Sequence, residues 1–518
     1  MWSSSLSRRE KYSVAVLSIT ALALRVPLAL RPERALTGLP YTDDAYYLFS
    51  IARHLAAGHG PSVEGVHLTN GFQPLIVLLY TPIFWLCGTD AWLAVRWSFI
   101  LNGVIAALSV WAVALVMRVL EREPQRNGLT APIIAAALWM GTFEIFGQMT
   151  NGLETGLLSL LLLLAIMLYA GILKDRANNA RVSLWRWAGF GAVLGLVVLT
   201  RIDAAILVAI FATMLFFERR PREAIVVGAI ALLMSLPWWI YNWAAFGSLM
   251  PSSGQAENSW PMPPFENIAK ATEAISEIAT LIVYLPHTLG RTVYGIWTFL
   301  LVPGLAWAFY RTRLREVFRL FRMKVLLPFL LFSLALLIFY VFFFRAPHFI
   351  SRYLQPGRML WSIVVAASAW MLWHGTNPRT ARPVMLALAA LGLFFFLAGY
   401  RVAFLTVPRS FDFYEMGEWA AQHPAEKIGM LQSGITSFIA PNVINLDGKV
   451  NSEALRAHQQ GRLAEYLRNE HFTYIADWKP FIEDIDTIAR RDELYFDSVG
   501  MVGYVQIMKL RMASSDTP

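Results

Sequence analysis

Apolar segments that can cross the hydrocarbon core of a bilayer, which takes ~20 residues, recur from near the N-terminus to about residue 400. Of the 518 residues, 57% are hydrophobic and only 15% are charged, whereas a soluble domain carries about 25% charged residues. The chain is therefore expected to be a polytopic membrane protein. Its N-terminal "RREK" and the apolar run that follows lack a small-residue cleavage site, which predicts an uncleaved first span.

The net charge of +9 does not indicate a nucleic-acid-binding protein, because the basic residues are confined to short loops between apolar segments. These loops are "SRREK", "MRVLEREPQR", "KDRANNARVSLWR", "ERRPRE" and "RTRLREVFRLFRMK". Such clustering follows the positive-inside rule and predicts that these loops are cytoplasmic. The single cysteine, Cys87, excludes an intrachain disulfide and a cysteine-based metal cluster.

The basic loops predict an all-α fold with about eleven transmembrane helices, an odd number. The expected spans are 11–30, 91–118, 130–146, 154–173, 187–200, 202–217, 224–246, 288–310, 325–345, 358–373 and 383–400. Residues 73–86 are apolar too, but Pro74 and Pro82 bracket a stretch of only about 12 residues, too short to span. We expect this segment to be interfacial or re-entrant; the alternative is that residues 73–118 cross three times.

The composition changes after Arg401. Short β-like runs, "KIGML", "VINLD", "YIADW" and "VGYVQIM", alternate with helical segments, which predicts a small α/β domain. The expected domains are a transmembrane domain over 1–400 and a soluble domain over 401–518 on the outer face. No phosphate-binding loop and no strand-linked G-x-G-x-x-G occurs, so no ATP or dinucleotide site is predicted.

Two adjacent carboxylates, Asp43 and Asp44, lie between the first span and the next apolar segment. The residues after them, "YYLFSIARHLAAG", have apolar side chains at helical spacing, and a second polar cluster, "HLTNGFQP", follows. An amphipathic helix of this kind lies along the membrane interface. The acids are either solvated loop residues or part of a site that handles the polar group of a lipid carrier.

The segment "TDDAYYLFSIARHLAAGHG…TNGFQPL" resembles the first outer loop of the GT-C superfamily of polyprenyl-phosphate-sugar-dependent glycosyltransferases. Similar elements follow in "NGLETGL", "LTRIDA", "PWWIYNWAAFGSLMPSSG", "SRYLQP" and "VINLDGKVN". The related groups are protein O-mannosyltransferases, lipid A aminoarabinose transferases and mycobacterial arabinofuranosyltransferases. The first two have Asp-Glu where this chain has Asp-Asp, and a Lys-Pro-Pro segment where it has "TNGF".

The resemblance implies a GT-C fold in a bacterial inner membrane, with the active site and the C-terminal domain on the periplasmic or extracellular side. It implies an inverting transfer of sugar from a polyprenyl-phosphate donor to a hydroxyl of a glycan, lipid or protein acceptor. By resemblance Asp43 is the general base, and Asp44 positions a substrate or depends on a bound divalent cation. A neighbouring carboxylate raises the pKa of one acid of such a pair.

Arg352 is the expected phosphate contact, because a cation stabilises the leaving lipid phosphate; the alternative is an interfacial arginine that reaches to lipid headgroups. Tyr353 is a candidate for stacking on sugar or lipid. Arg345 and His348 lie in the same expected loop.

Further candidates for substrate contact each have a structural alternative. Arg201 and Asp203 can pair with each other, and Glu154 can favour a helix N-terminus. Asn70 either binds sugar hydroxyls or forms an Asn-Gly turn. His54 could bind a metal with Asp44, although no ligand spacing supports this, and Tyr46 could belong to an aromatic belt.

Two other functions fit a chain of this composition. A transporter or flippase of a lipid-linked sugar would also need polar outer loops, but it should show paired broken helices near mid-membrane, which the sequence does not indicate. A non-catalytic scaffold built on the same fold would not require the carboxylate pair.

Overall fold

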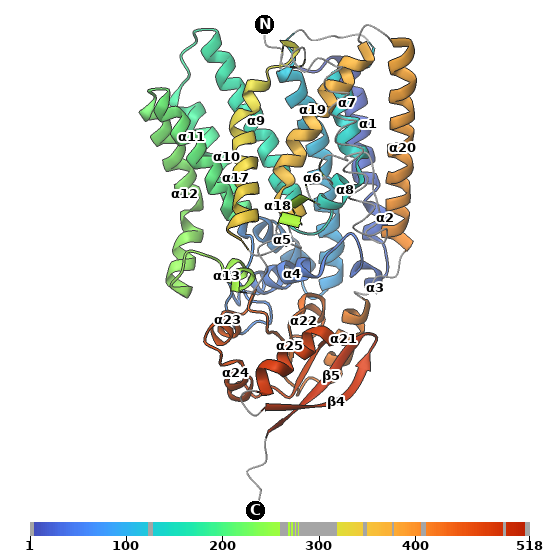
Figure 1. Ribbon diagram of the computed structural model, residues 1–518, viewed down its shortest axis with the longest axis vertical. Coiled ribbons are helices and arrows are strands. Elements are labelled where there is room, and N and C mark those ends of the chain that lie inside the picture. Colours follow the sequence, from blue (N-terminus) through green and yellow to red (C-terminus); the bar gives the residue numbers. More distant parts are fainter. Residues whose placement is uncertain are drawn as a thin grey trace, which may run out of the picture.

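The computed structural model has two parts, a helical bundle and a C-terminal α/β domain of residues 411–512 (Figure 1). It describes residues 5–122, 128–259, single positions between 268 and 320, 321–344, 350–374, 378–405, 411–490 and 494–512. The N-terminus lies at the end of the bundle away from the α/β domain. We call this the N-terminal end and the opposite one the domain end.

The bundle is built from long apolar helices. Six are long and apolar enough to cross a membrane among the described residues: Arg8–Ala29 (α1, Arg8–Ala23, with α2, Val26–Ala29), α6 (Ala91–Leu120), α9 (Thr155–Ala177), α12 (Pro221–Phe246), Met323–Phe342 (η3, Met323–Leu326, with α17, Leu327–Phe342) and Met385–Val402 within α20 (Pro378–Leu405). The remaining bundle helices are α7 (Ala131–Gly141), α8 (Phe143–Gln148), α10 (Leu184–Thr200), η1 (Ile202–Ala204), α11 (Ala205–Phe217) and α19 (Gln355–His374). Each expected span within the described residues has helix there, whereas 288–310 lies outside them, so the total of eleven stays a prediction.

Two expected spans differ in detail. The span 130–146 is divided between α7 and α8, because Thr142 takes an extended conformation between them. The short helices α10 and α11 form a hairpin that turns at Arg201, and this turn brings a buried arginine to the domain end of the bundle.

Helix α5 (Pro74–Cys87) packs on α4 near the domain end (Figure 1). Pro74 lines the cavity described below, and Trp92, at the start of α6, packs on Tyr414 and Phe438 of the α/β domain. With only 14 residues, α5 is also too short to cross. The expected interfacial or re-entrant course of 73–86 agrees with these contacts and stays a prediction.

The loop before α5 contains α3 (Glu33–Leu36) and α4 (Asp43–Ala56). Helix α4 begins after Thr42, and its two acids occupy the first turn, where the helix dipole favours negative charge. Every residue of α4 from Ala45 to Ala52 is buried. The helix is covered by α5 on one side and by α22 (Gly434–Ile439) of the α/β domain on another.

The α/β domain contains one five-stranded sheet in the order β2-β1-β3-β5-β4. Strand β1 pairs in parallel with β2 and β3, and β5 is antiparallel to both β3 and β4. The strands are β1 (Ile428–Met430), β2 (Val443–Asn445), β3 (Tyr474–Trp478), β4 (Leu494–Val502) and β5 (Val505–Met512); the other helices of the domain are α21 (Phe411–Ala421), α23 (Ser452–Gln459), α24 (Leu463–Asn469) and α25 (Lys479–Arg490). The small α/β domain expected from the sequence is confirmed.

Aromatic side chains join the domain to the bundle. Phe438 of α22 lies 5.3 Å from the ring of Tyr46 and 5.3 Å from that of Trp92, both in edge-to-face geometry. Edge-to-face pairs contribute about 0.5–1.5 kcal/mol beyond the burial of their area. The α/β domain is thus packed onto α4 and α6 rather than tethered by a linker alone.

Candidate active site

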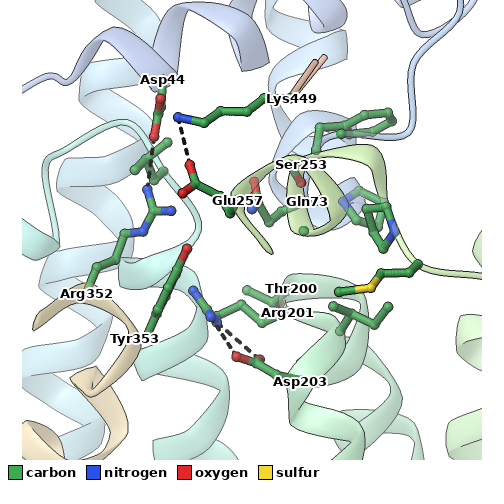
Figure 2. Close-up of a pocket in the computed structure, with 18 of the residues that line it drawn as sticks. Asp44, Gln73, Thr200, Arg201, Asp203, Ser253, Glu257, Arg352, Tyr353 and Lys449 are labelled. Atoms are coloured by element: carbon green, nitrogen blue, oxygen red, sulfur yellow. Dashed lines mark hydrogen bonds and ion pairs between the residues drawn. The ribbon is translucent and has the colours of Figure 1, made fainter. Parts of the chain in front are cut away.

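A cavity of about 360 Å³ lies where the bundle, the first loop and the α/β domain meet (Figure 2). Its walls come from α4, the start of α5, the α10–α11 turn, α12, α17 and two further short helices, α13 (Ser252–Ser259) and α18 (Ile350–Tyr353). The α/β domain adds Lys449 and Val450 from the loop after β2.

The lining combines apolar side chains, most of them from the bundle, with charged side chains that come from the bundle, α4, α13, α18 and the α/β domain. The apolar side chains from the bundle include Val198, Ile206, Trp238, Phe339 and Phe344. The charged side chains are Asp44, Arg201, Asp203, Glu257, Arg352 and Lys449, three acids and three bases. A cavity of this kind can hold an amphiphilic ligand with its polar group against the charged wall.

Asp44 is the acid of α4 that faces the cavity, and Arg352 is its partner. The guanidinium Nη1 of Arg352 lies 3.4 Å from Asp44 Oδ2, with 28% of the Asp44 side chain and 14% of the Arg352 side chain exposed (Figure 2). Although burial opposes the charge of Arg352, Glu154, Tyr353 and Asp44 raise its pKa above the ordinary value. Arg352 is therefore a fixed cation at the cavity wall.

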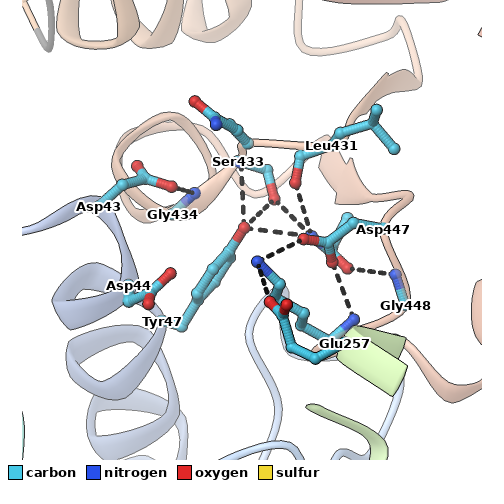
Figure 3. Close-up of polar contacts among 12 residues, drawn as sticks. Asp43, Asp44, Tyr47, Glu257, Leu431, Ser433, Gly434, Asp447 and Gly448 are labelled. Atoms are coloured by element: carbon cyan, nitrogen blue, oxygen red, sulfur yellow. Dashed lines mark hydrogen bonds and ion pairs between the residues drawn. The ribbon is translucent and has the colours of Figure 1, made fainter. Parts of the chain in front are cut away.

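Asp43 does not line the cavity; it accepts hydrogen bonds from the α/β domain. The backbone N–H groups of Gly434 and Ile435, at the start of α22, donate to its carboxylate at 3.0 and 2.8 Å (Figure 3). Burial, opposed by these bonds, and the nearby charge of Asp44 raise the pKa of Asp43 to about 6. Both carboxylate oxygens of Asp43 thus bind backbone amides, and the base role expected for Asp43 stays a prediction.

Tyr47, one turn after Asp43, also joins the cavity to the α/β domain. Its hydroxyl accepts from the backbone N–H of Ser433 and from Nδ2 of Asn445, at 3.0 and 3.1 Å (Figure 3). The loop 431–433 is itself held by Asp477, whose carboxylate accepts from the N–H groups of Leu431 and Gln432. These contacts fix the orientation of α4 against the sheet.

Arg201 is the centre of a buried ionic network at the bundle side of the cavity. It donates to Glu154 at 2.9 Å, to Asp203 at 2.6 Å and to the hydroxyl of Tyr340 at 2.9 Å. Its guanidinium also lies 4.6 Å from the ring centroid of Tyr353. Arg201 and Asp203 thus pair as the structural alternative expected, yet both line the cavity.

No protein-family model matches this chain, and no curated protein matches its sequence. The solved structures that share its architecture include two of ArnT from Cupriavidus metallidurans. The apo form is 11% identical, with a TM-score of 0.55, and the match covers 96% of this chain and 97% of ArnT. The form bound to undecaprenyl phosphate is 11% identical, with a TM-score of 0.56, and covers 98% and 99%.

ArnT is a lipid A aminoarabinose transferase with the GT-C architecture. This chain has the GT-C fold. The match extends over both the bundle and the α/β domain, so the GT-C arrangement expected from the motifs of the first loop is confirmed for the fold.

Within the GT-C fold, Asp44, Arg352, Tyr353 and Arg201 are brought together at the cavity. The ring of Tyr353 stacks on that of Tyr340, with 4.2 Å between the ring centroids. The guanidinium groups of Arg201 and Arg352 also contact the Tyr353 ring, so its position is fixed. Glu154 is fully buried and pairs with Arg201; it also occupies the N-cap position of α9, the helix N-terminus expected as its structural alternative. Arg345 and His348 lie outside the described residues.

Three expected contacts are not cavity residues in this GT-C fold. Tyr46 is buried among aromatic rings, and His54 binds the carbonyl of Ser62 through Nδ1 at 3.0 Å. Asn70 accepts from the N–H of Ser252 at 3.0 Å and so positions α13. Among the described residues, no group of three or more His, Cys, Asp or Glu is placed to hold a metal ion, so no residues present themselves for the divalent cation considered above.

Sequence reasoning missed Glu257 and Lys449. Glu257 lies in a Pro- and Ser-rich stretch that resembles a loop, and Lys449 follows β2 in the sequence "NLDGKV". Lys449 lies in the element "VINLDGKVN" that resembles the GT-C superfamily, but this resemblance did not assign it a role; Glu257 becomes a cavity residue through long-range packing.

Proposed function

We propose that this chain is an integral-membrane glycosyltransferase that moves a sugar from a polyprenyl-phosphate donor to a hydroxyl acceptor of the bacterial cell envelope. The transfer is inverting, Asp44 is the general base, and the reaction takes place on the outer face of the inner membrane. A glycan, a lipid or a protein is a suitable acceptor.

The observation that carries this proposal is the division of the cavity. Its apolar side opens on the bundle helices and suits a polyprenyl chain, and its charged side holds a carboxylate, Asp44, next to the cation of Arg352. The GT-C fold of ArnT, which binds undecaprenyl phosphate in one of its structures, supports the choice of a lipid-phosphate donor.

The reaction assigns a role to each side chain. Asp44 accepts the proton of the acceptor hydroxyl as its oxygen bonds to the anomeric carbon of the sugar. The bond from that carbon to the phosphate oxygen breaks on the opposite face, and the lipid phosphate leaves as an anion. Arg352 and Arg201 lie at the bundle side of the charged wall, where they stabilise the growing negative charge.

Asp44 replaces Asp43 as the proposed base for a geometric reason. A base must reach the acceptor proton directly or through one water. Asp44 lines the cavity, whereas the carboxylate of Asp43 is held by the amides of Gly434 and Ile435. Asp43 is therefore proposed to position α4.

The test compares Asp44→Asn with Asp43→Asn. Asp44→Asn preserves size and polarity but removes basicity, so transfer should slow at least ~100-fold while undecaprenyl phosphate still binds. Asp43→Asn should retain more turnover. The measurement is transfer of labelled sugar from a panel of polyprenyl-phosphate sugars to envelope membranes, with binding of undecaprenyl phosphate followed in parallel.

Loss of turnover in Asp43→Asn alone would return the base role to Asp43. Full turnover in both variants would remove the carboxylate from the mechanism. Movement of an intact lipid-linked sugar across proteoliposomes, without transfer, would instead favour the transporter function.

A further inference from the structure

The α/β domain contributes a cation to the cavity. Lys449 extends from the loop after β2, and its Nζ lies 2.8 Å from Glu257 of α13 and 3.5 Å from Asp447 (Figure 2). Although burial opposes the charge of the ammonium, Asp447, Asp44 and Glu257 raise its pKa above the ordinary value. The ammonium is thus charged and points to the same wall as Asp44 and Arg352.

The backbone of Lys449 is held as closely as its side chain. Its carbonyl accepts from the hydroxyl of Ser252 at 2.8 Å. The same carbonyl oxygen lies so near Gly71 that a Cβ at that position would be 1.7 Å away. Three segments, the first loop, α13 and the loop after β2, therefore meet at Lys449 and place its ammonium in a fixed position.

We infer that Lys449 is a substrate-binding residue that takes a phosphate oxygen at the site. This inference rests on the proposed function. Among the groups of a lipid-phosphate-sugar substrate, the phosphate carries the negative charge that an ammonium binds. A charge-assisted hydrogen bond from the ammonium to a phosphate oxygen is short and strong. Before substrate binds, Glu257 keeps the side chain extended and charged, so little further ordering is required.

The phosphate has two possible sources. The lipid phosphate of the donor approaches from the apolar side of the cavity, near Arg352 and Arg201. A phosphorylated acceptor would approach from the α/β domain, where Lys449 is rooted. Because the ammonium would bind either phosphate in the same way, an experiment is needed to distinguish the two sources.

The experiment compares full-length Lys449→Gln and Glu257→Gln with the matched control Lys427→Gln. Lys427 pairs with Glu470 at 2.7 Å in the same domain and does not line the cavity. If Lys449 binds phosphate, Lys449→Gln should weaken phosphate binding ~10-fold or more, as expected for a charge-assisted bond, whereas Glu257→Gln removes a competitor and should leave binding equal or tighter. Lys427→Gln should bind as the wild type does.

Two probes are titrated: undecaprenyl phosphate into the free protein, and inorganic phosphate into protein saturated with undecaprenyl phosphate. Weaker binding of the lipid in Lys449→Gln assigns the residue to the donor. Unchanged lipid affinity with loss of inorganic phosphate binding assigns it to the acceptor. Lys449→Arg, which retains the charge, should bind better than Lys449→Gln in either case and serves if Lys449→Gln folds poorly.

A purely structural ion pair gives a different pattern. Lys449→Gln and Glu257→Gln would then lower the melting temperature alike and leave both phosphate affinities unchanged, which overturns the inference and leaves the proposed function standing. A wild-type protein that fails to bind undecaprenyl phosphate would overturn both.

Discussion

Asp43 and Asp44 are adjacent, but successive residues of a helix point about 100° apart, so the two carboxylates meet different surroundings. Asp44 lies at the cavity with Arg352, and Asp43 binds the amides of α22. The sequence can indicate the pair as a candidate site, because the two acids open an amphipathic helix and a second polar cluster follows it. It cannot say which acid faces the substrate, since that depends on a helix almost 400 residues later.

Arg352 gives a prediction at the residue scale. Arg352→Ala should weaken binding of undecaprenyl phosphate about 10- to 100-fold, the effect of losing a charge-assisted hydrogen bond, and Arg352→Lys should restore only part of it because Lys lacks the guanidinium fork. Titration of the purified protein with the lipid measures this. Unchanged affinity in Arg352→Ala would shift the assignment to Arg201.

Asp43 predicts a pH dependence of stability. Its pKa is raised to about 6, above the ordinary 3.8, so the folded state binds this proton more tightly than the unfolded state does. The resulting stability is present below about pH 4 and is lost as the pH rises through about 6. The side chain of Asp43→Asn does not titrate. As the pH rises through this range, the melting temperature of the variant should therefore increase relative to that of the wild type. Parallel pH profiles of the two proteins in detergent would contradict this.

At the scale of the element, the contact between α4 and α22 determines how the α/β domain is attached. Gly434 begins α22 directly against Asp43, and a Cβ there would lie 2.2 Å from the Asp43 carbonyl oxygen. The sequence indicates α4 and the apolar core of the domain through their periodicity. It does not indicate this contact, because an approach of two backbones leaves no pattern beyond a single glycine.

Gly434→Ala tests the attachment. The added methyl group should force the two backbones apart, lower stability by about 1–3 kcal/mol and reduce turnover together with it. Gly500→Ala in β4 is the control, because no atom lies within 4 Å of its Cβ position. The melting temperature and the transfer rate of both variants provide the comparison; equal behaviour of the two would mean that α22 can move away without loss.

At the scale of the whole molecule, the charged ends of the helices and the α/β domain lie at opposite ends of the bundle. The ends of α9 and α11 meet at the N-terminal end of the bundle, where Arg176 pairs with Glu218 at 2.8 Å, and the α/β domain lies at the other end (Figure 1). The course of most helices could be predicted from segment length and loop charge. The site could be predicted only in part: Arg352 and Lys449 both lie in quoted motifs, but only long-range packing of α13 and of the α/β domain brings Glu257 and Lys449 to the cavity.

The predicted sidedness is tested by cysteine labelling in a Cys87→Ser background. Ser498 of β4 is exposed in the α/β domain, and Ser183 is exposed at the opposite end of the bundle, before α10. An impermeant thiol reagent on intact cells should label Ser498→Cys and spare Ser183→Cys, because the positive-inside rule predicts that the basic loops are cytoplasmic. Labelling of Ser183→Cys alone would reverse the orientation and move the cavity to the cytoplasmic face.

The close approach of Lys449 to Gly71 has a consequence for biosynthesis. A ribosome delivers the bundle first, and domains generally fold in the order in which they are made. The first loop and α4 therefore enter the membrane long before the loop that carries Lys449 exists, and the charged wall has a gap until the sheet has folded and docked. We therefore expect the bundle to hold Asp44, Arg201 and Arg352 in the membrane before Lys449 completes the charged lining of the cavity.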